Sequence, residues 1–149
     1  MIGFPPPIEL KDHFSKAHEL SKKLISTQTN EVLLHGDLHH ENVLSRSNGE
    51  FVCFDPKGFI GDPSYEIATI LKNPWNHPEI SQDIHLFTDR ARYFAKELQL
   101  PINRIFSFAY VHLCLSIAWS IEDGQAYTYQ KKILSEVYEK LDHYFQTNL

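Results

Sequence analysis

The sequence is short of cysteine and of basic residues, and each shortage excludes a class of protein. Its 149 residues include two cysteines, too few for a disulfide-rich scaffold. Cys53 and Cys114 each lie in an apolar run, so we expect two buried free thiols in a reducing compartment. Lys and Arg total 14 against 19 Asp and Glu, which gives a net charge of −5. A general nucleic-acid binder needs a basic face, so we expect no nucleic-acid partner.

Long apolar runs are also lacking. The longest candidate, residues 105–121, has 17 residues and contains His112 and three serines, whereas a membrane span needs about 20 predominantly apolar residues. We therefore expect a buried helix there and no membrane partner. The first ten residues carry no basic segment followed by a long apolar stretch, so we expect no signal peptide. Together with the free thiols, this pattern predicts a cytoplasmic protein.

The remaining pattern is mostly helical. Apolar residues spaced three and four apart predict a helix over residues 8–26, and a short buried strand follows, ending near Gly36. Residues 56–64 are rich in glycine and proline and are predicted to form a loop. Further helices are predicted over residues 63–72, 80–98, 102–122 and 125–147. This order predicts one α+β domain over residues 1–149, a helical lobe that carries a short β-hairpin.

The hairpin is the clearest local signal. Two apolar runs flank Asn48-Gly49, a pair that readily adopts the positive φ angles of a tight turn, which predicts strands near 42–46 and 50–55. The hairpin would bring its two ends, Asn42 and Asp55, close together. A carboxamide and a carboxylate so placed can share a hard divalent cation, and Mg²⁺ prefers oxygen ligands.

A second acidic residue, Asp37, completes this group. Asp37 lies in the loop just before the hairpin, from which it can accept a proton from an incoming hydroxyl. A general base and a Mg²⁺ site are the main components of a phosphoryl-transfer site. The sequence therefore predicts such a site at the open end of the hairpin.

The histidines of the same stretch allow a second interpretation. His35, His39 and His40 alternate with Asp37 in a spacing that some metallohydrolases use to bind zinc. Zinc does not explain a hairpin that ends in Asp-Pro, and neighbouring histidines tend to point apart. A His/Asp metallohydrolase nevertheless stays open as an alternative.

"HGDLHHENVL" followed by "FDPKGFIGDP" resembles the aminoglycoside phosphotransferase family, and most of all its streptomycin and hydroxyurea kinase branch. The resemblance implies a protein-kinase-like fold that uses ATP and Mg²⁺. It implies that Asp37 is the catalytic base and that Asn42 and Asp55 ligate the Mg²⁺ bound to ATP. His35 would brace the catalytic loop, and Asp62 would do the same through hydrogen bonds to backbone amides.

Other residues take weaker roles from the same resemblance. Lys57 would lie near the transferring phosphate. "AWSIEDG" resembles a late helix of this branch, in which Glu122 and Asp123 would face a cationic or polar substrate. The chain departs from the family in two carboxylates. Glu41 stands where a small residue is usual, and Glu66 stands near a usual aspartate.

The largest departure concerns the nucleotide lobe. The family's N-terminal lobe carries a loop that covers the nucleotide, and no Gly-rich turn between strands lies upstream of residue 35. We therefore expect this chain to be the C-terminal lobe alone. One hypothesis is an antibiotic-resistance kinase that phosphorylates a hydroxyl of an aminoglycoside-like or other small polar molecule. The other is a catalytically inactive lobe that self-associates or needs a partner chain to supply the missing lobe.

Overall fold

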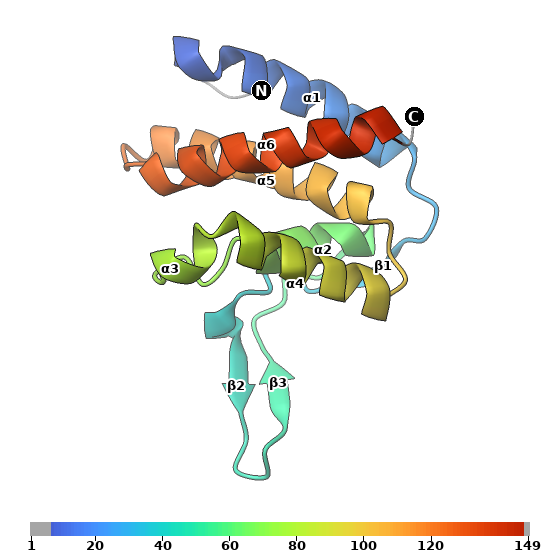
Figure 1. Ribbon diagram of the computed structural model, residues 1–149. Coiled ribbons are helices and arrows are strands. Elements are labelled where there is room, and N and C mark those ends of the chain that lie inside the picture. Colours follow the sequence, from blue (N-terminus) through green and yellow to red (C-terminus); the bar gives the residue numbers. More distant parts are fainter. Residues whose placement is uncertain (1–6, 148–149) are drawn as a thin grey trace.

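The computed structural model describes residues 7–147, with side chains to residue 142, and is built mostly of helices (Figure 1). The elements in chain order are η1 Ile8–Leu10, α1 Lys11–Ser26, β1 Val32–Leu34, η2 His40–Asn42, β2 Val43–Ser45, β3 Phe51–Cys53, β4 Phe59–Gly61, α2 Pro63–Leu71, α3 Pro78–Ser81, α4 Ile84–Glu97, α5 Ile102–Glu122 and α6 Thr128–Thr147. Two short antiparallel sheets accompany the helices. The prediction of a mostly helical α+β chain is confirmed.

Helix α5 is the centre of the fold. It packs against α1, α2, α4 and α6, and in Figure 1 α1 lies on one side of the α5–α6 pair while α2 and α4 lie on the other. Its side chains Phe106, Tyr110 and Ile117 are fully buried. Within the described residues it is also the one helix long and apolar enough to cross a membrane, although 56% of that window is buried inside the protein. The prediction of a buried helix over residues 105–121 is confirmed.

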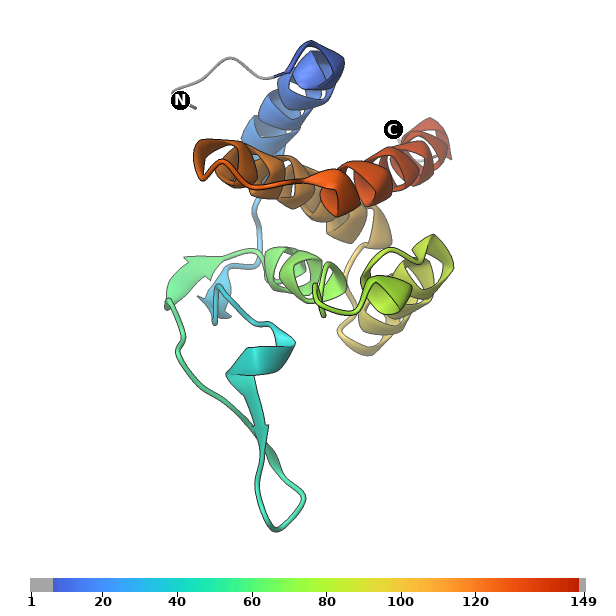
Figure 2. The same ribbon diagram turned by 90° about the vertical axis from the view of Figure 1, so that its left-hand side faces the viewer.

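The two sheets set the geometry of the candidate site. Strands β2 and β3 pair in antiparallel register with Val43 opposite Cys53, and this hairpin projects away from the helices (Figures 1 and 2). Strands β1 and β4 pair with Leu34 opposite Phe59. The predicted loop over residues 56–64 is therefore wrong at β4, because pairing with the distant β1 draws this segment into a sheet.

Three further predictions need correction. Cys53 is exposed rather than buried, since the two-stranded hairpin has no layer packed against that face. Asn42 lies in the 3₁₀ turn η2 instead of opening a strand. The helix expected over residues 80–98 is divided into α3 and α4, because the Asp83 carboxylate accepts hydrogen bonds from the backbone amides at the start of α4.

Candidate active site

The loop that follows β1 positions Asp37. Gly36 has a φ of 80°, and a Cβ atom there would lie 2.5 Å from the ring of Phe59, so only glycine fits without displacement. The Gly36 N–H donates to a Glu66 carboxylate oxygen at 3.0 Å. Helix α2 thus holds the residue directly before Asp37 and fixes the path of the loop.

Asn42 connects this loop to the hairpin. Its side chain is buried, and its amide nitrogen donates to the Asp37 carbonyl oxygen at 3.0 Å. The Asn42 carbonyl accepts from the Phe54 N–H at 3.1 Å. These two bonds tie Asn42 to Asp37 on one side and to the residue before Asp55 on the other. The predicted proximity of the two hairpin ends is therefore present in the backbone.

The two aspartates meet at one lysine. The Lys57 ammonium lies 3.2 Å from an Asp55 carboxylate oxygen and 3.7 Å from an Asp37 carboxylate oxygen. Its hydrogen bond to Asp55 and the charges of both carboxylates raise the Lys57 pKa. Asp55 itself has a φ of 56°, a conformation that costs a non-glycine residue energy and is concentrated at functional sites. The Lys57 ammonium therefore lies within 4 Å of both Asp37, the predicted base, and Asp55, a predicted metal ligand.

The donor set at this point fits a magnesium-nucleotide site. Mg²⁺ usually takes one or two protein carboxylates and completes its shell with phosphate oxygens and waters. Asn42 and Asp55, at the adjoining hairpin ends, would supply an amide oxygen and a carboxylate oxygen to such an ion. Among the described side chains, no three His, Cys, Asp or Glu residues converge as a metal site. The arrangement thus suits a cation that arrives with phosphate and gives the zinc hydrolase alternative no support.

His35 contacts the segment beyond the hairpin. Its Nε2 atom lies 2.8 Å from the Phe54 carbonyl oxygen, and its own carbonyl accepts from the Lys57 N–H at 2.7 Å. The Asp37 N–H approaches the His35 Nδ1 atom at 3.4 Å. Through these contacts the His35 ring links the Asp37 backbone to the segment after β3, as a residue that braces the catalytic loop would. Its role in catalysis stays a prediction.

Asp62 hydrogen-bonds a backbone amide, as expected, but this amide belongs to the start of α2 and not to the Asp37 loop. Its carboxylate caps α2 by accepting from the Ser64 N–H at 2.8 Å and pairs with the Arg104 guanidinium. The Asp62 N–H donates to the Gln28 side chain. The Asp37 loop instead donates a hydrogen bond to α2 at the Glu66 carboxylate. Sequence reasoning identified Glu66 only as a departure from the family. It missed that Glu66 lies on the face of α2 toward the Asp37 loop.

A polar cavity of about 240 Å³ opens beside Asp37. Its wall includes Asp37, His39, Glu41, Lys72, Trp75 and Tyr129. Burial lowers the Lys72 pKa to about 8, against a smaller opposing effect of the Asp37 charge. Sequence reasoning missed Lys72 and Tyr129, because they come from the end of α2 and the start of α6. Nothing in their local sequence marks them as neighbours of Asp37.

The predicted substrate carboxylates lie outside this wall. Glu122 ends α5 and Asp123 follows as its cap residue, and both are exposed. Neither is among the residues that line the polar cavity. Their proposed contact with a substrate stays a prediction.

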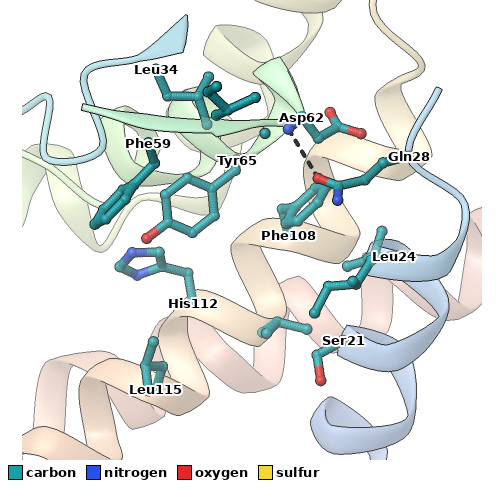
Figure 3. A pocket seen from close by; sticks show the side chains of 14 residues that line it. Ser21, Leu24, Gln28, Leu34, Phe59, Asp62, Tyr65, Phe108, His112 and Leu115 are labelled. Carbon is teal, nitrogen blue, oxygen red and sulfur yellow. Dashed lines mark hydrogen bonds between the residues drawn. The ribbon is translucent and has the colours of Figure 1, made fainter. Parts of the chain in front are cut away.

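A second cavity, of about 280 Å³, lies between α1, α2, α5 and β4 and is lined mostly by apolar side chains (Figure 3). Figure 3 shows the Tyr65 hydroxyl and the His112 ring pointing toward one another at one side of it. His112 is buried, and burial together with the Lys72 charge lowers its pKa to about 3. His112 is therefore neutral at pH 7. Asp37 and Asp55 do not line this cavity, so it is not the candidate site of phosphoryl transfer.

Comparison with known proteins identifies the family of the chain. Residues 9–124 match the profile of a family described as aminoglycoside/hydroxyurea antibiotic resistance kinase. The chain belongs to this family. The matched residues include the Asp37 loop, the hairpin and all of α2.

Similar curated proteins are kinases of the same kind. Streptomycin 6-kinase of Streptomyces griseus is 30% identical over 93 residues, which cover 62% of this chain and 30% of that protein. Streptomycin 3''-kinase of Klebsiella pneumoniae is 36% identical over 58 residues, or 39% of this chain and 22% of that protein. Hydroxyurea phosphotransferase of Kitasatospora aureofaciens is 30% identical over 106 residues, or 68% of this chain and 28% of that protein. The chain thus spans less than a third of the length of these relatives. No solved structure matches it.

Proposed function

We propose that the chain carries the catalytic base and the metal ligands of an ATP-dependent phosphotransferase. Its acceptor would be a hydroxyl of an aminoglycoside-like or other small polar molecule. The observation that carries the proposal is the convergence of Asp37 and Asp55 on one lysine ammonium beside an open polar cavity. Membership of an antibiotic-resistance kinase family supports the same reaction class. The chain would form the C-terminal lobe of a kinase-like fold and act in the cytoplasm.

Each residue has a defined task in this proposal. Asp37 accepts the proton of the acceptor hydroxyl. The hydroxyl oxygen bonds to the γ-phosphorus of ATP as the bond between this phosphorus and ADP breaks. Mg²⁺ held with ATP by Asn42 and Asp55 would neutralise charge on the phosphoryl oxygens. Lys57 bridges Asp37 and Asp55, which lowers their mutual repulsion. The hydrogen bond from Gly36 to Glu66 keeps the loop in place, and such positioning supplies much of the catalysis in phosphoryl transfer.

A second candidate function is a catalytically inactive lobe that self-associates or awaits a partner chain carrying the nucleotide lobe. The observation that favours it is exposed apolar surface. Leu33 and Ile60 are cross-strand partners in the β1–β4 sheet and are 77% and 75% exposed. Large apolar side chains exposed together mark surfaces that another protein segment covers.

The experiment that tests the first proposal is a thermal melt of the full chain with MgATP, with ATP plus EDTA as control. A ligand at about 100 times its Kd stabilises the folded state by about 2.7 kcal/mol. This raises the midpoint by several degrees, at roughly 2–8 °C per kcal/mol for small domains. We expect a Mg²⁺-dependent rise in the wild type and in Asp37→Asn, but not in Asp55→Ala.

Phosphoryl transfer is then measured with the acceptors of the relatives, streptomycin and hydroxyurea. We expect Asp37→Asn to abolish transfer while it keeps its fold and its melting shift. Turnover by Asp37→Asn at the wild-type rate would remove Asp37 as the base. Absence of any MgATP shift in the wild type would overturn the proposal and favour the inactive lobe.

A further inference from the structure

The apolar cavity between α1, α2, α5 and β4 has one polar corner, made by His112 and Tyr65 (Figure 3). His112 is 5% exposed, and its Nδ1 atom is buried without a hydrogen-bond partner among the described residues. Tyr65 is half-buried, and within the described part of the chain its hydroxyl forms no hydrogen bond. The two ring centroids lie 5.4 Å apart. Two neighbouring polar groups of this wall therefore lack partners.

The other polar side chains of the wall are already engaged. The Ser21 hydroxyl donates to the His18 carbonyl oxygen at 2.8 Å. The Gln28 side-chain oxygen accepts from the Asp62 N–H at 3.1 Å, and the Asp62 carboxylate pairs with the Arg104 guanidinium. Asp62 alone among the lining residues carries a formal charge at pH 7. A charged ligand would therefore meet no free opposite charge in this wall.

The rest of the wall is apolar and has room for a ring. The cavity measures about 280 Å³, whereas an apolar cavity of about 150 Å³ in another protein is enough to hold benzene. Transfer of an aromatic ring from water into such surroundings is favourable. The apolar side chains come from α1, β1, β4 and α5 and include Leu24, Leu34, Phe59, Phe108 and Leu115.

The imidazole of His112 sets the kind of group that completes the site. Burial, together with the Lys72 charge, lowers its pKa to about 3, so at pH 7 the ring is neutral and keeps one nitrogen that can accept a hydrogen bond. A buried polar group that lacks a partner is unfavourable. A ligand hydroxyl can donate to this ring and accept from the Tyr65 hydroxyl, because a hydroxyl is both donor and acceptor.

We propose that this cavity binds a small uncharged phenol or aryl alcohol, with its ring among the apolar side chains and its hydroxyl at His112 and Tyr65. A mostly apolar wall with a few convergent polar groups is typical of small-molecule sites. Neither Asp37 nor Asp55 lines the cavity, so the site is separate from that of phosphoryl transfer. The inference therefore does not rest on the proposed function.

The test compares three probes of similar size: 4-methylphenol, p-xylene and benzoate. Each is titrated into the ¹⁵N-labelled full chain, and Kd is read from amide shifts over residues 108–115 of α5, the segment that borders the cavity. We expect 4-methylphenol to bind at least about fivefold more tightly than p-xylene, the scale of one net hydrogen bond. Benzoate should bind at least about tenfold more weakly than 4-methylphenol, because its charge would be buried without a partner.

Two variants remove the polar corner in steps. His112→Leu replaces an unpartnered imidazole with an apolar side chain and should reduce the preference for 4-methylphenol over p-xylene to within about twofold. Tyr65→Phe removes a single hydroxyl and should reduce the preference in part, and it tests the proposal even if His112→Leu does not fold. The control is His85→Leu, which removes an exposed histidine in the first turn of α4 that does not line the cavity. It should leave the preference unchanged.

A third variant tests where the probes bind. Leu115 lines the cavity and is half-buried, so Leu115→Trp should fill part of the space and weaken both 4-methylphenol and p-xylene by at least about tenfold. Wild-type affinities in Leu115→Trp would place the probes elsewhere and overturn the proposal. So would an absence of 4-methylphenol binding, binding of p-xylene as tight as that of 4-methylphenol, or an unchanged preference in Tyr65→Phe and His112→Leu.

The MgATP melt separates this inference from the proposed function. A Mg²⁺-dependent shift without binding of 4-methylphenol overturns the site in the apolar cavity and leaves the phosphotransferase. Binding of 4-methylphenol with the expected loss in His112→Leu supports the site whether or not MgATP raises the melting midpoint.

Discussion

At the end of α2 the Lys72 ammonium lies partly buried beside Asp37, and burial lowers its pKa to about 8. In the unfolded chain its pKa is close to the ordinary 10.4 of a lysine. The unfolded state therefore binds this proton more tightly than the folded state. As the pH falls from above 10 to about 8, this difference lowers the free energy of unfolding, and below pH 8 the loss is constant. At pH 7 Lys72 thus destabilises the fold.

Lys72→Met is expected to stabilise the chain. Methionine keeps the length of the side chain and removes the charge that burial disfavours, so the free energy of unfolding at pH 7 should rise by on the order of 2 kcal/mol. The gain should shrink by about half when urea melts are repeated near pH 9.5, because Lys72 is then largely neutral in the folded state. An equal gain at both pH values would show that packing rather than charge is the cause.

Lys72 lines the polar cavity beside Asp37, and residues that serve function at a cost in stability are common at functional sites. Lys96→Met is the control, because it removes an exposed charge in the last turn of α4. It should change the free energy of unfolding by less than about 0.5 kcal/mol in either direction.

Three helices meet at one guanidinium near the start of α5. Arg104 pairs with the Asp62 carboxylate at the head of α2 and donates to the Leu24 carbonyl at 2.7 Å and the Thr27 hydroxyl at 2.9 Å near the end of α1. The side chains of Asp62 and Arg104 are 9% and 19% exposed, so both charges are largely removed from water. Asp62 therefore stabilises an inter-helix junction in addition to capping α2.

Asp62→Ala should lower the free energy of unfolding by about 3 kcal/mol, because it removes a helix cap and leaves Arg104 partly buried without its partner. Asp62→Asn keeps a capping oxygen and should lose less. Asp89→Ala is the matched control: it breaks the exposed pair with Arg92, whose partners are 62% and 72% exposed, and should cost under about 0.5 kcal/mol. Urea melts give all three values. Similar losses for Asp62→Ala and Asp89→Ala would contradict a structural role for the junction.

Elements with a strong local signal were predicted, whereas features that depend on distant contacts were not. The apolar run of β1 predicted a strand, but that strand was expected to be buried and two of its three residues are exposed. The hairpin depends on the Asn48-Gly49 turn and the runs beside it, so its existence could be predicted. Strand β4 forms because Gly61 pairs with Val32, 29 positions earlier, and no local pattern reports that contact. The α3–α4 break depends on one capping side chain, Asp83, within an otherwise continuous helical pattern.

The candidate site divides in the same way. Asp37, Asn42 and Asp55 are close in sequence to the hairpin, so the turn alone was enough to predict that they gather. The residues that complete the surroundings, Glu66 and Lys72, come from α2. Which side of α2 faces the Asp37 loop depends on packing against α5 and β1, and the spacing of apolar residues does not specify that orientation.

On the scale of the whole molecule, an apolar surface stands outside the helical core. Leu33 and Ile60 are direct cross-strand partners in the two-stranded β1–β4 sheet and are 77% and 75% exposed. Cross-strand neighbours on one face form a continuous patch. A short sheet with two free edges and an exposed apolar face favours association with another chain. The chain itself is the partner present in a purified sample.

We therefore predict that the purified chain self-associates through this sheet, and that its weight-average mass in sedimentation equilibrium rises with concentration. The double variant Leu33→Lys/Ile60→Glu should remove the apolar pair, replace it with an opposite-charge pair that the strands tolerate, and keep the chain monomeric. Leu98→Lys changes a residue that is 51% exposed and follows α4, so it should associate as the wild type does. If the double variant associates as strongly as the wild type, the contact lies elsewhere. If MgATP raises the melting midpoint more in the double variant than in the wild type, self-association competes with nucleotide binding.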